Sequence, residues 1–206
     1  MAASERARMK LVEALQVLLP LRGERIVVTT MGAAREWPKL SQHPLDLHYI
    51  PSSMGQAPAL GLGLAMAQPE REVIVLNGDG AMLMNLGSLV TVVASRARNI
   101  TLIVLENGIY EVTGGQQTAA GAMAGANGVD SGEVDLAAIA RGAGFKSTWR
   151  FDRLEEWSGR AAEVLSAPGP RFIVLAVEPV GANYHLESPG PIAARLASFR
   201  RALATA

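Results

Sequence analysis

Residues 73–110 read VIVLNGDGAMLMNLGSLVTVVASRARNITLIVLENGIY. Two short apolar runs, at residues 73–77 and 100–105, are rich in β-branched side chains, which is typical of strands buried on both faces of a sheet. An apolar segment of helical length, at residues 81–96, separates the two runs. This order predicts two parallel strands joined by a crossover helix, the repeating unit of an α/β fold.

The same alternation continues on both sides of this segment. It predicts a three-layer α/β fold, with a mostly parallel sheet and helices on both faces. Further strands are expected at residues 26–30, 146–150 and 172–177, and further helices at residues 9–19, 57–67, 135–142, 154–165 and 190–206. Asp152 is expected to cap the helix at 154–165, with Glu155 as its capping-box partner. We expect a single domain over residues 1–206, with a C-terminal helical extension from about residue 188.

The composition excludes several classes of function. Of the 206 residues, 49% are hydrophobic and 18% charged, which suits one sizeable core. The 19 basic residues balance 19 acidic ones, so neither nucleic acid nor a membrane surface is expected as a partner. The absence of cysteine rules out disulfides, thiolate metal sites and a cysteine nucleophile. Residues 1–10 lack the apolar core of a signal peptide, and no apolar run reaches the roughly 20 residues of a membrane span, so a cytoplasmic protein is expected.

The turn Gly78-Asp79-Gly80 joins the first apolar run to the helical segment. Ligands of open parallel sheets bind beyond the carboxyl ends of the strands, where a helix start offers free N–H groups to an anion such as phosphate. The glycines allow the backbone to approach the ligand closely, and the carboxylate can hold a cation against the phosphate. The alternative is a structural turn in which Asp79 only caps the helix.

A second polar group follows the next strand, at Asn107. Because adjacent parallel strands end side by side, the carboxylate of Asp79 and the amide oxygen of Asn107 are expected at the same edge of the sheet. Both are hard oxygen donors of the kind that Mg²⁺ prefers, and diphosphate oxygens, water and a backbone carbonyl would complete its octahedron.

The GDG turn, a spacer of this length and Asn107 together resemble the signature of enzymes that depend on thiamine diphosphate. The resemblance implies that Asp79, Asn107 and the main chain of Ile109 bind Mg²⁺. It also places at the cofactor Gly78, Gly80, Ala81 and Tyr110. Two positions depart from the family's pattern. Glu106 stands where the family usually has another Asn, and Ala81 stands where many members have Ser, which puts a hydroxyl contact to the diphosphate in doubt.

Residues 48–55, HYIPSSMG, resemble the family's segment that holds the aminopyrimidine ring. The resemblance implies that the carbonyl of Ser52 accepts a hydrogen bond from the amino group of the ring, beside Ser53, and that Met54 wedges the cofactor into its bent shape. Ordinary core packing is the alternative for Met54. Gly32, after the first strand, sits where family members touch the diphosphate.

Residues 78–118, with the run Thr-Gly-Gly-Gln at 113–116, are similar to the β subunits of two-subunit 2-oxoacid decarboxylases acting on sulfopyruvate or phosphonopyruvate. These enzymes divide the cofactor site between two modules, and the chain corresponds to the diphosphate-binding one. The resemblance implies a separate pyrimidine-binding α subunit that supplies the activating Glu, in a hetero-oligomer with at least two copies of each chain. Catalytic residues of this chain itself remain unknown. The almost wholly apolar helices at 57–67 and 81–96 also favour association.

The implied activity is a thiamine-diphosphate- and Mg²⁺-dependent lyase reaction that releases CO₂ from a small 2-oxoacid. Two alternatives stay open: a carboligase that forms an acyloin-type carbon–carbon bond, and a non-catalytic scaffold subunit. No Lys or Arg lies between Arg98 and Arg141, so a sulfonate or phosphonate group would need cationic contacts from the partner. Residues 111–118 are expected to cover the active site, or else to form a flexible surface loop. His48 and His185 are expected to be structural or surface residues.

Overall fold

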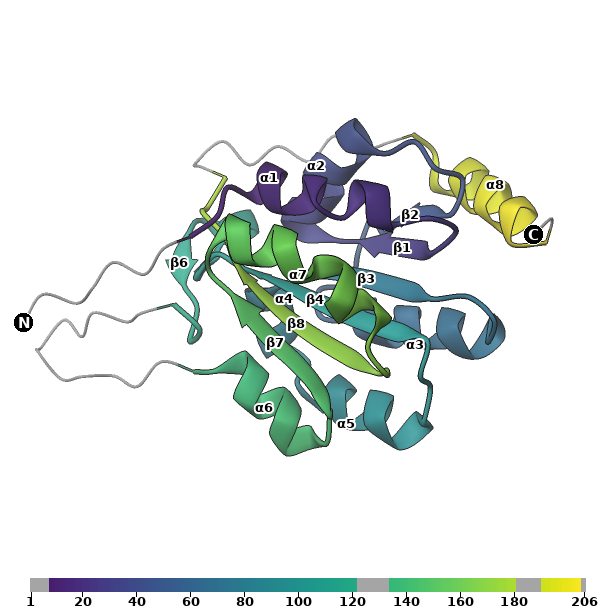
Figure 1. The fold of residues 1–206 in the computed structure, drawn as a ribbon. Helices are drawn as coiled ribbons and strands as arrows, with labels where there is room; N and C mark the ends of the chain where they lie inside the picture. Colours follow the sequence, from purple (N-terminus) through teal and green to yellow (C-terminus); the bar gives the residue numbers. More distant parts are fainter. Residues whose placement is uncertain (1–7, 122–133, 181–189, 205–206) are drawn as a thin grey trace, which may run out of the picture.

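The computed structural model describes residues 8–121, 134–180 and 190–204, which are built around a six-stranded sheet (Figure 1). The strand order is β2-β1-β3-β4-β8-β7. In that order the strands span Asp46–His48, Ile26–Thr29, Val73–Gly78, Ile100–Glu106, Arg171–Ala176 and Ser147–Phe151. Every neighbouring pair in this sheet is parallel, so all six carboxyl ends lie at one edge.

Helices cover both faces of the sheet. One face carries α1 (Leu11–Gln16), α2 (Met31–Leu40) and α7 (Leu154–Ser166). The other carries α3 (Ala57–Ala67), α4 (Asp79–Leu83), α5 (Gly87–Ser95) and α6 (Leu136–Ala143), and α8 (Ile192–Ala204) lies beside the edge strand β2. The expected three-layer fold with a mostly parallel sheet is confirmed.

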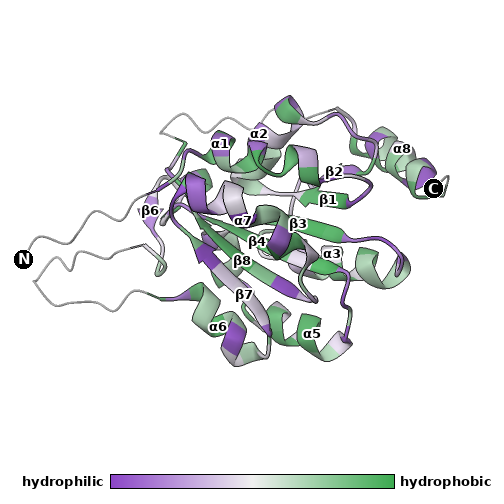
Figure 2. Cartoon of the chain, in the orientation of Figure 1, coloured by the Kyte–Doolittle hydropathy of each residue, from purple (hydrophilic) through white to green (hydrophobic). Residues whose placement is uncertain are grey.

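Two apolar clusters fill the spaces between the sheet and its helices. Strand β3 contributes alternately to both, since Val73 and Val75 belong to one cluster and Ile74 and Leu76 to the other. Every residue of β1, β4 and β8 is buried, and these strands are hydrophobic along most of their length (Figure 2). Close packing on β3 requires a glycine in α3, because a Cβ at Gly61 would meet the Val75 side chain at 2.2 Å.

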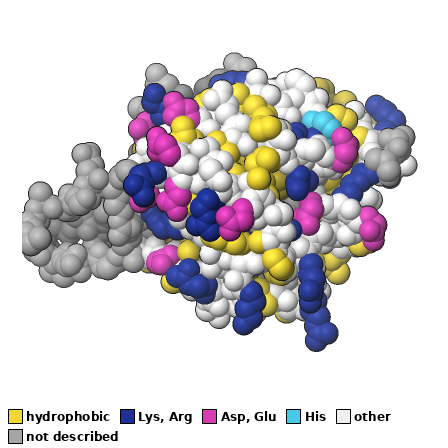
Figure 3. All heavy atoms as spheres, in the orientation of Figure 1, with side chains coloured by type: hydrophobic (Ala, Val, Ile, Leu, Met, Phe, Trp, Pro, Cys, Tyr) yellow, Lys and Arg dark blue, Asp and Glu magenta, His cyan; other side chains and the backbone are white. Residues whose placement is uncertain are grey.

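The surface carries charges of both signs. Acidic and basic side chains are interspersed on the face seen in Figure 3. Within the described ranges, no helix combines the length and the apolar character needed to cross a membrane.

Some elements differ from the sequence expectation. The helix expected at 81–96 is divided into α4 and α5, because the side-chain amide of Asn85 donates to the Gly55 carbonyl at 3.0 Å and holds the intervening turn against the preceding loop. The helix expected at 9–19 is a shorter α1 followed by a 3-10 turn at Leu19–Leu21. Helix α2 and strand β2 were not anticipated.

The expected cap at Asp152 is wrong. Helix α7 starts one residue later than the capping box requires, so that Arg153 occupies the N-cap position, and no side-chain hydrogen bond caps this helix. The segment after β4 is not structureless, because β5 (Ile109–Tyr110) and β6 (Gln116–Gln117) form a small antiparallel pair around a 3-10 turn at Glu111–Thr113. The expected start of the C-terminal extension near residue 188, and His185, lie outside the described residues.

Candidate cofactor-binding site

A pocket of about 620 Å³, part of it open to solvent, lies at the carboxyl edge of the sheet. Its walls come from the turn after β1, the turn from β3 into α4, and the segments that follow β4 and β8. Strands β3 and β4 are neighbours, with Gly78 opposite Leu105, so the two turns that carry Asp79 and Asn107 lie side by side. The position is the usual one for ligands of parallel α/β sheets.

Asp79 is the buried carboxylate of this pocket, with 1% of its surface exposed. Its Oδ2 accepts hydrogen bonds from the Gly108 backbone N–H at 3.1 Å and from the Thr118 hydroxyl at 2.7 Å. Burial raises the pKa of Asp79 above its usual value, and the hydrogen bonds from Thr118 and the backbone oppose this shift. A divalent cation beside the carboxylate would favour the ionised form, so the group is suited to hold one.

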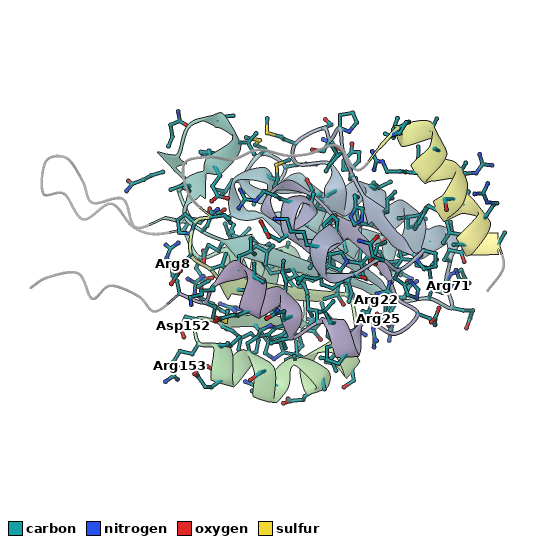
Figure 4. The ribbon with its side chains drawn as sticks, turned by 90° about the horizontal axis from the view of Figure 1, so that it is seen from above. Arg8, Arg22, Arg25, Arg71, Asp152 and Arg153 are labelled. Carbon is teal, nitrogen blue, oxygen red and sulfur yellow. The ribbon has the colours of Figure 1, made fainter. Side chains whose placement is uncertain are left out.

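Asn107 and Ile109 line the same pocket. The side-chain oxygen of Asn107 accepts from the Ile109 backbone N–H at 3.0 Å, which folds the amide over its own turn. The Arg8 guanidinium (Figure 4) donates to the Asn107 carbonyl, and to the Val177 carbonyl at 3.3 Å. The turn after β4 is therefore held by a hydrogen bond within the turn and by a hydrogen bond from Arg8.

The ring of Tyr110 lies so close to the backbone at position 80 that only a glycine fits there. A Cβ at Gly80 would lie 2.6 Å from the Tyr110 ring, closer than real contacts allow. The same hypothetical atom would meet the Thr118 methyl at 3.5 Å. The glycine thus lets the β5–β6 pair pack directly on the turn that carries Asp79.

The family described as "Thiamine pyrophosphate enzyme, C-terminal TPP binding domain" matches residues 28–175. The chain belongs to this family. Its match runs from β1 to β8 and so includes every strand of the main sheet and the turns that carry Asp79 and Asn107.

Two curated relatives are informative about this thiamine-diphosphate-binding domain. Phosphonopyruvate decarboxylase of Streptomyces viridochromogenes is 36% identical over 202 residues, which cover 96% of this chain and 47% of the relative. The sulfopyruvate decarboxylase subunit beta of Methanothermobacter thermautotrophicus is 34% identical over 173 residues, which cover 84% of each chain. The chain therefore spans about half the length of the first relative, at 47%, and most of the second.

A solved structure shares the fold. A putative thiamin diphosphate-dependent enzyme from Mycobacterium smegmatis superposes with a TM-score of 0.66 at 20% identity, covering 84% of this chain and 32% of the other.

The residues of the domain fit a magnesium diphosphate. Asp79, Asn107 and Ile109 can offer a carboxylate, an amide and a carbonyl oxygen, the donor set that Mg²⁺ prefers. The described residues contain no group of three or more His, Cys, Asp or Glu side chains that could bind a metal by themselves.

Nine of the eleven positions expected at the cofactor line the pocket: Gly32, Met54, Gly78, Asp79, Gly80, Ala81, Asn107, Ile109 and Tyr110. Ser52 and Ser53 do not line it. Ser52 is partly buried, and the Ser53 backbone N–H donates to the Tyr49 hydroxyl at 3.2 Å. The structure thus brings together the positions expected at the diphosphate, whereas of the positions expected at the pyrimidine ring only Met54 reaches the pocket.

Met54 is 42% exposed, so the core-packing alternative is wrong. Its segment is tied to the diphosphate side of the pocket, because Asn85 donates to the Gly55 carbonyl, and a Cβ at Gly55 would lie 3.1 Å from the Ala81 carbonyl. An exposed thioether at a pocket wall is available to contact a ligand.

Glu106, the departure from the family's usual Asn, does not line the pocket. Its side chain is 2% exposed and pairs with the Arg150 guanidinium of β7. His48 likewise does not line the pocket. Burial and the nearby Arg195 lower the pKa of His48, while Asp46 opposes the shift, and the Thr29 hydroxyl lies 3.0 Å from its Nδ1.

Neither the hydrogen bond from Thr118 to Asp79 nor the backbone conformation of Met31 could be predicted from the sequence. Thr118 bonds to Asp79 only because of the β5–β6 pairing, and Met31 has a φ of 53°, which is unusual for a side chain other than glycine. Two further carboxylates, Glu111 and Glu178, line the pocket, and no Lys or Arg is among its described lining residues.

Proposed function

We propose that the chain is the β subunit of a thiamine-diphosphate- and Mg²⁺-dependent 2-oxoacid decarboxylase. The observation that carries the proposal is the buried Asp79 carboxylate, which shares a pocket with Asn107 and Ile109 at the ends of neighbouring strands. The names of the two curated relatives support a small 2-oxoacid as the substrate.

Each part of the pocket has a role in this proposal. Asp79, Asn107 and the Ile109 carbonyl would hold Mg²⁺, and the backbone around Gly32 and at Gly80–Ala81 would receive the diphosphate. The exposed Met54 side chain would support the cofactor at the pocket wall. Thiamine diphosphate, when bound, supplies the electron sink for the loss of CO₂. Glu111, Val112 and Thr113 line the pocket, and the segment from Glu111 to Thr118 would exclude water during the reaction.

The proposal includes a pyrimidine-binding α subunit, which contributes the activating Glu and cationic contacts to the acidic end of the substrate. Relatives named subunit beta support such a partner. An uncharged face supports it too. No charged residue occurs at residues 50–69 or 80–95, and this surface exposes Met54, Met66, Met84 and Val90. We infer at least two copies of each chain, and a cytoplasmic location stays a prediction.

The test is a calorimetric titration of thiamine diphosphate with Mg²⁺ into the chain co-purified with its α subunit. Asp79→Asn keeps the shape of the side chain but removes the charge, and we expect it to weaken binding by about 100-fold or more. The control is Asp152→Asn, at the start of α7 (Figure 4), which should bind like the wild type. Binding that is indifferent to Asp79→Asn would make the GDG turn a structural cap only.

The reaction is tested on the same complex with a series of 2-oxoacids. Release of CO₂ with an aldehyde product supports the decarboxylase. An acyloin product would instead identify a carboligase, and cofactor binding without turnover of any 2-oxoacid would identify a scaffold subunit.

A further inference from the structure

Helix α8 lies outside residues 28–175, the range of the family match, yet it packs on the part of the domain that leads into the pocket. Phe199 is 5% exposed and belongs to the apolar cluster that includes Leu47 of β2. At the far end of the helix, Arg71 (Figure 4) donates to the Leu203 carbonyl at 3.5 Å. The helix is thus docked along the edge strand.

Arg195 of α8 binds the chain just after β2. One terminal nitrogen of its guanidinium donates to the His48 carbonyl at 2.7 Å, and the other donates to the Ile50 carbonyl. Its Nε donates to the Gly190 carbonyl at 3.1 Å, which fixes the side chain to the start of its own helix. The side chain is partly buried, so these bonds are partly shielded from water. The planar fork of an arginine is suited to bridge two carbonyls two residues apart.

The bridged carbonyls stand immediately before Ser52 to Met54. Further along, the Gln56 N–H donates to the Ser53 carbonyl at 3.1 Å, and Asn85 holds the Gly55 carbonyl. Residues 51–54 are therefore anchored at both ends, by Arg195 on one side and by Asn85 on the other. Between these anchors, the exposed Met54 side chain is presented to the pocket.

We propose that Arg195 is a positioning residue that holds residues 49–54 in place at the cofactor pocket, so that helix α8 takes part in cofactor binding. That the bound molecule is thiamine diphosphate rests on the proposed function. That Arg195 fixes this segment does not, because the contacts lie within the chain. Arg195 acts on the pyrimidine side of the pocket and leaves the diphosphate side, around Asp79, unchanged.

The first measurement is hydrogen exchange of the full chain without ligand. Arg195→Gln should accelerate exchange in a peptide covering residues 49–56 by about tenfold, since the anchored backbone opens locally, and should leave residues 100–106 of β4 unchanged. Arg195→Lys should have a smaller effect, because the ammonium keeps part of the donor set. Arg200→Gln, an exposed position on the same helix, is the matched control and should match the wild type. Unchanged exchange at 49–56, or equal acceleration in β4, would overturn the proposal.

The second measurement separates the two halves of the pocket. Thiamine diphosphate with Mg²⁺ and inorganic diphosphate with Mg²⁺ are titrated into the chain with its α subunit. We expect Arg195→Gln to raise the Kd of thiamine diphosphate by about tenfold and to leave that of inorganic diphosphate unchanged. Equal losses for both would overturn the proposal. If the wild type binds neither, the proposed function fails, while the exchange experiment still decides the role of Arg195.

Discussion

Gly80 shows how one missing side chain permits the arrangement of the pocket. We predict that Gly80→Ala lowers the free energy of unfolding by about 1–3 kcal/mol, because its Cβ would lie 2.6 Å from the Tyr110 ring and would displace the hairpin. Thiamine diphosphate binding should weaken as well, since Thr118 of that segment bonds to Asp79. Urea unfolding and a cofactor titration measure the two effects.

The control for this change is Gly159→Ala in α7, where nothing lies within 4 Å of the added Cβ. It should raise stability by about 0.5–1 kcal/mol, because alanine loses less backbone entropy than glycine in a helix. If Gly80→Ala raised the free energy of unfolding as Gly159→Ala does, the close contact with Tyr110 would have no effect on stability.

Among individual residues, the sequence identified those whose position follows directly from a neighbouring predicted strand. Asp79 and Asn107 follow predicted strands directly, so their place at one edge of the sheet could be inferred from strand order. Thr118 could not be found in this way. It lies 39 residues from Asp79, and the contact depends on the pairing of β5 with β6, which no hydrophobic pattern indicates.

Between elements, Glu106 and Arg150 connect the end of β4 to the edge strand β7 across β8. We predict that Arg150→Met destabilises the fold by about 3 kcal/mol, because it removes the guanidinium that pairs with a carboxylate that is 2% exposed. Glu106→Gln added to Arg150→Met should recover part of this loss. Chemical denaturation of the single and double variants measures the coupling.

Arg153→Met is the matched control for this pair. The Arg153 side chain is 68% exposed and its ion pairs are 3.9 and 4.0 Å long, so the change should cost less than about 0.5 kcal/mol. Equal stability losses in the two Met variants would mean that the buried pair contributes nothing beyond an exposed one.

The elements that the sequence missed had weak local signals. Strand β2 has three residues, too few for a period of two to be recognised. Helix α2 contains Gly32 near its start and Pro38 near its end, residues that usually interrupt helices. Strand β2 is stabilised by pairing with β1 and by the packing of α8, and helix α2 by its packing against β3, α1 and β1. These are tertiary effects that single-sequence patterns do not contain.

For the whole molecule, the uncharged face on α3 and α5 is where we expect the α subunit to bind. Val90 is 59% exposed on α5, and Val90→Glu should weaken association with the α subunit by about tenfold or more, because a charge would be desolvated in the interface. The fold should be unaffected. Sedimentation of the mixed subunits measures the association.

Ala162→Glu adds the same charge to an exposed position of α7, on the opposite face of the sheet, and should leave association unchanged. A complex of Val90→Glu as stable as the wild type would place the partner elsewhere.

The strand order also affects how the protein is made. Strand β8 lies between β4 and β7, although it follows both in the chain. During synthesis, one edge of β4 therefore stays without a neighbouring strand until residues 171–176 emerge from the ribosome. Strand β4 itself is apolar over most of its length. An unpaired apolar strand can pair with other chains, so the period before β8 inserts is when a nascent chain is most prone to aggregate and most dependent on chaperones.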